Sequence, residues 1–220
     1  MPIFIDNVLD AHAANAISES LDDLTLFTDG KNTAGKTARA VKQNLQANTE
    51  ANAVIGATTL IDQAIRKHPY IKHAAIPAKF AKIMINRYEP GMTYGAHVDN
   101  AIIANVRTDL SFTLFLSEPD SYEGGELILQ KHDGDDAVKL PKGSLYLYPS
   151  NTVHYVAPVT KGSRLAAVGW IQSRVRLEEK RSTLFDIYLA LQGLKDTEEN
   201  KNTRLSLLKV QNNLMRLWAD

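Results

Sequence analysis

The chain has 220 residues, 25 basic side chains against 25 acidic ones, and no cysteine. This length allows one or at most two domains, and a hydrophobic content of 44% with 23% charged residues is typical of a folded protein. Zero net charge argues against a general nucleic-acid binder. Without cysteine there can be no disulfide, thiolate zinc site or cysteine nucleophile, so any metal site must use imidazole and carboxylate groups.

The N-terminal part of the chain, between residues 9 and 68, is predicted to be helical. Asp10 can cap a first helix, and residues 50–67 have apolar side chains at helical spacing up to Pro69. There is no basic segment followed by an apolar core at the N-terminus, and no apolar run reaches the ~18 residues of a membrane span. We therefore expect a cytoplasmic protein without a membrane partner.

Residues Gly30 to Thr37 match G-x-x-x-x-G-K-[ST], the phosphate-binding P-loop. In a P-loop, Lys36 would contact the terminal phosphate and Thr37 a magnesium ion. Such a loop works at the edge of a parallel sheet built from βαβ units, whereas the rest of this chain has an antiparallel pattern. We interpret the match as a chance resemblance and keep a nucleotide binder as an alternative.

The middle of the chain, about residues 78–175, is predicted to be an antiparallel β-sandwich or jelly roll. Most of the proline and glycine residues lie there, and they separate short apolar runs that are typical of strands. These runs are AKIMINRYE, DLSFTLFLS, GGELILQ, GSLYLYP, HYVAPV and SRLAAVGWIQ.

Three residues in this region form a candidate metal site. His97 and Asp99 stand two apart on a predicted strand, so their side chains should share one face, and His154 opens a later strand. Two imidazoles and one carboxylate are the ligands of non-haem Fe(II) sites with open positions. The same set could activate water on zinc, so a metal-dependent hydrolase is an alternative; however, the chain lacks the H-E-x-x-H motif.

Arg164 follows His154 by ten residues, across a turn that contains Pro158 and Gly162. A hairpin would bring Arg164 alongside the His154 strand and point it into the same interior. A guanidinium can hold a carboxylate through two parallel hydrogen bonds, and a buried arginine without a partner is costly. A dicarboxylate co-substrate would supply that partner, while a hydrolase would give Arg164 no role.

From Tyr88 to Arg164 the chain resembles the Fe(II)/2-oxoglutarate-dependent dioxygenases. More closely, RYEPGMTYGAHVD, EGGEL and HYVAPVTKGSRLAAVGW resemble the bacterial PKHD-type (prolyl/lysyl-hydroxylase-like) hydroxylases, as do the DGxxTAG stretch near Gly30 and the helical tail. The resemblance implies that His97, Asp99 and His154 bind iron and that Arg164 binds the distal carboxylate of 2-oxoglutarate. It also implies a role for Tyr88 at that carboxylate and for Tyr94 near the substrate.

Other side chains are candidates for the pocket wall. Trp170 shares a strand face with Arg164, and Asn86 shares one with Tyr88. Core packing is the favoured role for Trp170 and Asn86. For Tyr88 and Tyr94 packing is an equal alternative, since tyrosine is a favoured strand residue.

The resemblance implies the activity and the cofactors. Fe(2+), 2-oxoglutarate and O2 would be used to hydroxylate an unactivated C–H bond, with release of succinate and CO2, and L-ascorbate is a candidate reductant. The substrate would be a peptidyl prolyl or lysyl residue or a small molecule, with iron uptake as a candidate setting. A non-catalytic jelly-roll binding module is a further alternative.

The C-terminal part, residues 176–220, is predicted to be a small helical appendage to a domain of residues 1–175. Apolar side chains recur there at helical spacing in two stripes. The stripes fit a cover for the β-core, a substrate-binding element or a homodimer interface. The expected fold is therefore α+β, with a double-stranded β-helix (jelly-roll) core, N-terminal helices packed outside it and a helical tail. The two stripes are Leu184, Ile187 and Leu191, then Leu207, Val210, Leu214 and Leu217.

Overall fold

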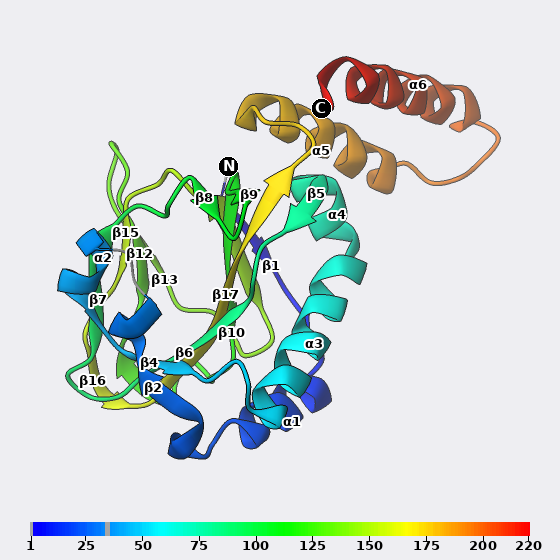
Figure 1. The fold of residues 1–220 in the computed structure, drawn as a ribbon. Coiled ribbons are helices and arrows are strands. Elements are labelled where there is room, and N and C mark those ends of the chain that lie inside the picture. Colours follow the sequence, from blue (N-terminus) through cyan, green and yellow to red (C-terminus); the bar gives the residue numbers. More distant parts are fainter. Residues whose placement is uncertain (1, 34–35) are drawn as a thin grey trace.

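The computed structural model describes the backbone of residues 2–33 and 36–220, and it describes the side chains of these residues except those of residues 33–38. The fold has two facing antiparallel sheets with helices outside them (Figure 1). The helices are α1 (Ala11–Ser20), α2 (Lys36–Val41), α3 (Asn52–Lys67), α4 (Pro69–Ala75), α5 (Glu178–Gly193) and α6 (Lys201–Trp218), with 3-10 turns η1 (Leu24–Leu26) and η2 (Gly30–Thr33). The strands are β1 (Ile3–Ile5), β2 (Phe27–Asp29), β3 (Lys42–Gln43), β4 (Leu45–Ala47), β5 (Pro77–Phe80), β6 (Met84–Tyr88), β7 (Thr93–His97), β8 (Ile102–Ile103), β9 (Val106–Arg107), β10 (Leu110–Phe115), β11 (Tyr122–Gly124), β12 (Leu127–Leu129), β13 (Asp136–Val138), β14 (Leu145–Pro149), β15 (His154–Val156), β16 (Val159–Gly162) and β17 (Arg164–Ser173).

The strands form a major and a minor sheet. The major sheet has the order β1-β14-β10-β17-β6-β4-β2, with β5 beside β17, and the minor sheet has the order β13-β12-β15-β7-β3. Short pairs β11-β16 and β8-β9 lie apart from these two sheets. This arrangement confirms the predicted α+β fold with a jelly-roll core.

Four strands of the core precede residue 78, and three of them, β2, β3 and β4, lie in the region that was predicted to be helical. Strand β1 pairs with β14, β2 and β4 extend the major sheet beyond β6, and β3 pairs with β7 in the minor sheet. The expectation that the core begins near residue 78 was therefore wrong. Strands of two or three residues are too short to show an alternation, and they form because longer strands present a free edge.

The major sheet has two chemically different faces because neighbouring strands are in register. Opposite Trp170 and Val168 of β17 lie Ser111 and Thr113 of β10. These side chains point between the two sheets, whereas the alternate residues pack against the helices in the main hydrophobic core. One face thus builds the core and the other is free to build a site.

Helices α1, α3 and α4 cover the outer face of the major sheet (Figure 1). The Asp10 carboxylate accepts a hydrogen bond of 2.8 Å from the Ala13 backbone N–H, which confirms the predicted cap of α1. Helix α3 ends before Pro69 as predicted, but Pro69 then begins α4, which was not predicted. Proline is well tolerated in a first helical turn because its missing N–H would have no partner there.

The P-loop-like segment does not lie in a P-loop setting. The strand before it, β2, pairs antiparallel with β4, and no parallel pair is present among the described strands. Ala34, Gly35 and the side chains of Lys36 and Thr37 lie outside the described residues. The antiparallel setting of β2 agrees with the interpretation of this match as a chance resemblance.

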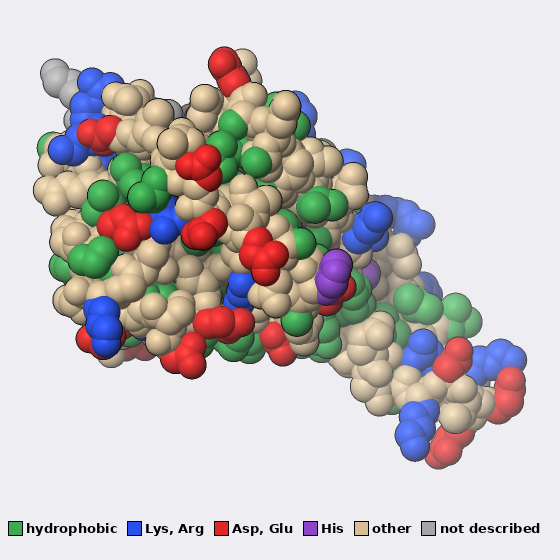
Figure 2. All heavy atoms as spheres, turned by 90° about the horizontal axis from the view of Figure 1, so that it is seen from below, with side chains coloured by type: hydrophobic (Ala, Val, Ile, Leu, Met, Phe, Trp, Pro, Cys, Tyr) green, Lys and Arg blue, Asp and Glu red, His purple; other side chains and the backbone are tan. Residues whose placement is uncertain are grey.

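Helices α5 and α6 form an antiparallel pair that projects from the sandwich at the C-terminus (Figure 1). Figure 2 shows this projection from below, with basic and acidic side chains mixed at its tip. The inner face of α6 packs Leu214, Met215 and Trp218 onto the buried Leu184 and its neighbours. No described helix has the length and apolar character needed to cross a membrane.

Part of the apolar stripe of α6 lies in solvent. Val210 is 47% exposed and Leu217 75% exposed, so both lie beside the inner face and not on it. An apolar stripe wider than the contact with one neighbouring helix leaves its margins in solvent.

Candidate metal centre

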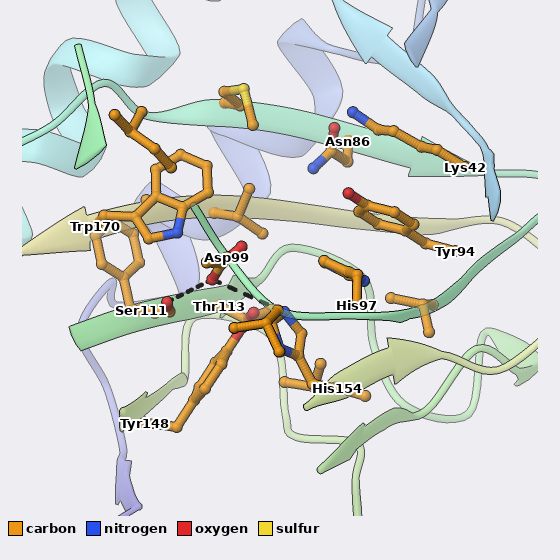
Figure 3. A pocket seen from close by; sticks show the side chains of 18 of the residues that line it. Lys42, Asn86, Tyr94, His97, Asp99, Ser111, Thr113, Tyr148, His154 and Trp170 are labelled. Carbon is orange, nitrogen blue, oxygen red and sulfur yellow. Dashed lines mark hydrogen bonds and ion pairs between the residues drawn. The ribbon is translucent and has the colours of Figure 1, made fainter. Parts of the chain in front are cut away.

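A cavity of about 160 Å³ lies between the two sheets. It is lined by every residue that the sequence assigned to the site, and Figure 3 shows several of them converging from different strands. These predicted residues are His97, Asp99, His154, Arg164, Tyr88, Tyr94, Trp170 and Asn86.

His97, Asp99 and His154 come together as predicted, although Asp99 does so by a different route. Strand β7 ends at His97, so Asp99 lies beyond the strand and does not share its pleat. His154 begins β15 and lies directly opposite His97 in the ladder between β15 and β7. One potential ligand atom from each residue lies within 4.8 Å of the others. The pairing of two strands, and not the H-x-D spacing alone, therefore brings the three groups to one point.

Hydrogen bonds orient both imidazoles. The Nδ1 atoms of His97 and His154 each lie 2.9 Å from a backbone carbonyl oxygen, those of Gly95 and Thr152. A carbonyl can only accept, so each Nδ1 carries the proton and each Nε2 keeps a free lone pair for a metal. Burial is the main cause, and the neighbouring His154 the second, of a lowered pKa of about 4 for His97, so this ring is neutral near pH 7.

The Asp99 carboxylate is held by two serines that the sequence analysis missed. Ser111 donates a hydrogen bond of 2.6 Å to Asp99 Oδ2, and the Ser111 and Ser150 hydroxyls lie 2.7 Å apart (Figure 3 shows the Ser111 contact). The hydroxyls of Ser111 and Thr113, at alternate positions of the run DLSFTLFLS, were the available signal for Ser111. Fixed outer partners of this kind hold a ligand ready for a metal.

Arg164 lines the same cavity, but the predicted hairpin was wrong. Strand β17 pairs with β10 and β6 of the major sheet, whereas the His154 strand belongs to the minor sheet. Arg164 therefore faces the metal residues across the interior, opposite Tyr88 in the ladder with β6. It is 2% exposed and its Nε atom has no hydrogen-bond partner. Among the described residues no carboxylate forms an ion pair with it.

The tyrosines and Trp170 form the walls. Tyr94 stacks on His97, with ring centres 3.7 Å apart, and the Tyr88 ring lies 5.2 Å from the Arg164 guanidinium carbon. Burial raises the pKa of both tyrosines, so their hydroxyls are neutral donors near pH 7. Trp170 Nε1 and Asn86 Oδ1 are buried without hydrogen-bond partners.

Lys42 is a further charged residue in the cavity, and the sequence analysis missed it. The residue was assigned to a helical region, but it begins β3 and is 3% exposed. Burial, with repulsion from Lys82, lowers the pKa of Lys42 to about 8, while Asp29 acts in the opposite direction. A single lysine in ARAVKQNLQ gave no signal, because its inward position depends on a two-residue strand.

The donor set fits an iron ion. Two free imidazole nitrogens and a pre-oriented carboxylate would hold such an ion through three ligands, and the chain has no thiol that could compete. The buried guanidinium without an acidic partner fits a carboxylate from outside the chain.

Comparison with known proteins identifies the family. The chain is 49% identical over 194 residues to a PKHD-type hydroxylase of Parvibaculum lavamentivorans, covering 88% of each chain. The chain belongs to the PKHD-type hydroxylase family. A PKHD-type hydroxylase of Synechococcus elongatus is 43% identical over 225 residues, covering 100% of each chain. Residues 83–172 match the 2OG-Fe(II) oxygenase superfamily, and residues 178–220 match the PKHD-type hydroxylase C-terminal domain.

Solved structures agree on the fold. A prolyl-4-hydroxylase from Pseudomonas putida has a TM-score of 0.55 and 21% identity, covering 79% of this chain and 92% of its own. A prolyl hydroxylase from Trichoplax adhaerens, solved with a hypoxia inducible factor peptide, has a TM-score of 0.58 and 17% identity, covering 83% and 86%. This PKHD-type hydroxylase therefore has the fold of the 2-oxoglutarate oxygenases.

The family membership confirms the predicted enzyme class. The protein is an Fe(II)- and 2-oxoglutarate-dependent dioxygenase that uses Fe(2+), 2-oxoglutarate and O2, and its His–Asp–His cluster fits iron binding. The hydrolase, nucleotide-binding and non-catalytic alternatives lose their support. Enzymes of this superfamily act on peptides or small molecules.

Proposed function

We propose that His97, Asp99 and His154 bind the iron of this dioxygenase and that Arg164 binds the distal carboxylate of 2-oxoglutarate. The observation that carries the proposal is the meeting of three ligand atoms within 4.8 Å in a cavity that also holds a buried arginine. The bound iron and co-substrate would supply the oxidising chemistry, and the chain would supply ligands, orientation and the cavity that holds them.

Each group of the chain has a distinct task in this proposal. The backbone carbonyls of Gly95 and Thr152 keep the two Nε2 atoms directed to the metal, and Ser111 keeps the Asp99 carboxylate in position. The Tyr88 hydroxyl would donate to the carboxylate that Arg164 holds. Asn86 and Trp170, whose buried polar atoms have no partner, would contact co-substrate or substrate, and Tyr94 would lie beside the substrate.

Anaerobic addition of Fe(II) and 2-oxoglutarate tests these roles through the visible absorbance of the iron–oxoglutarate complex. We expect the band in the wild type and its loss in His97→Ala and Asp99→Ala. Arg164→Ala should still bind iron but need at least tenfold more 2-oxoglutarate, because the charge-assisted pair is lost.

His132→Ala is the matched control, since His132 is exposed and far along the chain from the cluster. It should behave as the wild type. A full band in Asp99→Ala, or unchanged 2-oxoglutarate affinity in Arg164→Ala, would contradict the assignment.

We further propose that the substrate is a peptidyl prolyl or lysyl residue or a small molecule, with iron uptake as a candidate setting. The names of the relatives support the general class of reaction. Screening candidate peptides and small molecules for stimulated succinate release would identify the substrate, and ascorbate dependence can be measured in the same assay.

The organisation of the whole chain is also a proposal. We infer a catalytic part of residues 1–175 and an appendage of residues 176–220, which is supported by family matches that end at 172 and begin at 178. A homodimer and a cytoplasmic location stay predictions, which light scattering and cell fractionation would test.

A further inference from the structure

Lys42 is a buried cation whose charge has few hydrogen-bond or charge partners among the described residues. Its Nζ donates to Gln46 Oε1 at 3.3 Å and lies 5.6 Å from the centre of the Tyr94 ring. An ammonium has three N–H donors, so one amide acceptor leaves it poorly satisfied. Among the described residues, no carboxylate forms an ion pair with Lys42.

The position of Lys42 is next to the reacting centre and inside the cavity. Lys42 lies opposite Tyr94 in the ladder between β3 and β7, and Tyr94 stacks on the candidate ligand His97. Figure 3 shows Lys42, Asn86 and Tyr94 at one end of the pocket and Trp170 at the other. A group bound to Lys42 would thus be one aromatic ring away from the metal ligands.

The charges in the cavity do not balance without a further anion. Asp99 is the acidic residue among the described lining residues, and Lys42, Lys82 and Arg164 are the basic ones. With the ligands of the proposed function in place, the two charges of Fe(II) and that of Arg164 offset those of Asp99 and 2-oxoglutarate. Lys82 is exposed and solvated, but the charge of Lys42 is enclosed. Burying a charge without a partner is costly, so the remaining ligand is the natural source of an anion.

We propose that Lys42 binds a carboxylate of the primary substrate, with Lys82 attracting that carboxylate at the rim of the cavity. The proposal rests on the proposed function, because Arg164 must already be occupied by 2-oxoglutarate. It favours an acidic small molecule, or a residue next to a free carboxylate, over a neutral residue inside a peptide.

Matched acid and amide probes test the proposal. The full chain is loaded with Zn(II), which is diamagnetic, and with 2-oxoglutarate. Binding of N-acetyl-L-proline and of N-acetyl-L-prolinamide is then measured by ligand-observed NMR. We expect the acid to bind the wild type at least tenfold more tightly than the amide. Lys42→Gln should reduce this preference to about one, and Lys42→Arg should retain most of it.

Lys79→Gln is the matched control, since Lys79 is an exposed lysine of β5 outside the cavity lining and its loss should keep the full preference. If Lys42→Gln does not fold, Lys42→Met takes its place. The proposal is overturned by an equal affinity of acid and amide in the wild type, or by a preference that survives in Lys42→Gln.

The 2-oxoglutarate signals separate this proposal from the proposed function. If the acid displaces 2-oxoglutarate, or if Lys42→Gln weakens 2-oxoglutarate as much as Arg164→Gln does, Lys42 belongs to the co-substrate site and the proposal fails. If the wild type does not bind 2-oxoglutarate at all, the proposed function fails and the Lys42 proposal fails with it. Normal 2-oxoglutarate binding with equal affinity for acid and amide overturns the Lys42 proposal alone.

Discussion

At the scale of single residues, the site depends on two imidazoles whose direction is set by the backbone. Each candidate histidine donates its Nδ1 proton to a carbonyl two residues earlier, Gly95 for His97 and Thr152 for His154. The same short motif on two strands leaves both Nε2 atoms free for a metal. Because burial favours the neutral ring, the protein is prepared for metal before metal arrives.

The low pKa of His97 predicts a pH-dependent stability of the metal-free protein. In the unfolded chain this imidazole titrates near pH 6.5, whereas in the folded protein its pKa is about 4. Between these values the unfolded state binds a proton that the folded state does not. The free energy of unfolding should therefore fall as the pH falls, by about 2 kcal/mol between pH 7 and pH 5 from this residue.

Urea unfolding of the metal-free wild type and of His97→Gln at both pH values measures this effect. The glutamine side chain does not titrate, so the free energy of unfolding of the variant should fall less between pH 7 and pH 5 than that of the wild type. Equal pH dependence in the two proteins would show that His97 is not held neutral by the fold.

At the scale of elements, the glycine turn before β12 positions the strand that leads to Arg164. Gly124 has a φ of +71°, and a Cβ built there would lie 2.1 Å from the Pro158 carbonyl oxygen. The turn therefore packs directly against the backbone between β15 and β16. Glycine is required at this position both by its conformation and by the close approach.

We predict that Gly124→Ala lowers the free energy of unfolding by about 2–5 kcal/mol, since left-handed strain costs about 1–2 kcal/mol and overpacking costs about 1–3 kcal/mol. Gly91→Ala is the matched control, because Gly91 also has a positive φ of +85° but nothing within 4 Å of its built Cβ. That variant should lose about 1–2 kcal/mol. Similar losses in the two variants, measured by urea unfolding, would show that the contact with Pro158 is unimportant.

At the scale of the whole molecule, the two ends of the chain differ in how firmly they are held. Strand β1 lies in the major sheet and α1 packs in the main core, whereas α6 has no buried residue and contacts the rest through one partly buried face. Local opening free energy follows the amount of buried apolar contact. The tail should therefore open more easily than the sandwich.

The two tryptophans can report on these two parts separately. Trp170 is 6% exposed in the cavity, and Trp218 packs at the end of α6. The Trp170→Phe variant keeps only Trp218 and reports on the tail, and the Trp218→Phe variant keeps only Trp170 and reports on the sandwich. We expect the fluorescence of Trp218 to change at a lower urea concentration than the fluorescence of Trp170. Circular dichroism of each variant gives the global transition for reference. Coincident midpoints would show that tail and sandwich unfold as one unit.

Much of the site could be predicted from the sequence alone. The absence of cysteine limits a metal site to nitrogen and oxygen ligands, and His97, Asp99, His154 and Arg164 stand out by type and spacing within a strand-rich region. Alternation also assigned Trp170 to the face of Arg164, because the side-chain direction in a strand is a local property.

The tertiary structure decided which strands are neighbours. Alternation gives the face on which a residue lies, but it does not say which sheet a strand joins. Arg164 was therefore expected on the strand next to that of His154, whereas it lies on the opposite sheet and faces His154 across the interior. The same limit concealed Lys42 and Ser111, which reach the cavity through pairing with residues far away in the chain. Pairing of this kind depends on long-range contacts that no local pattern records.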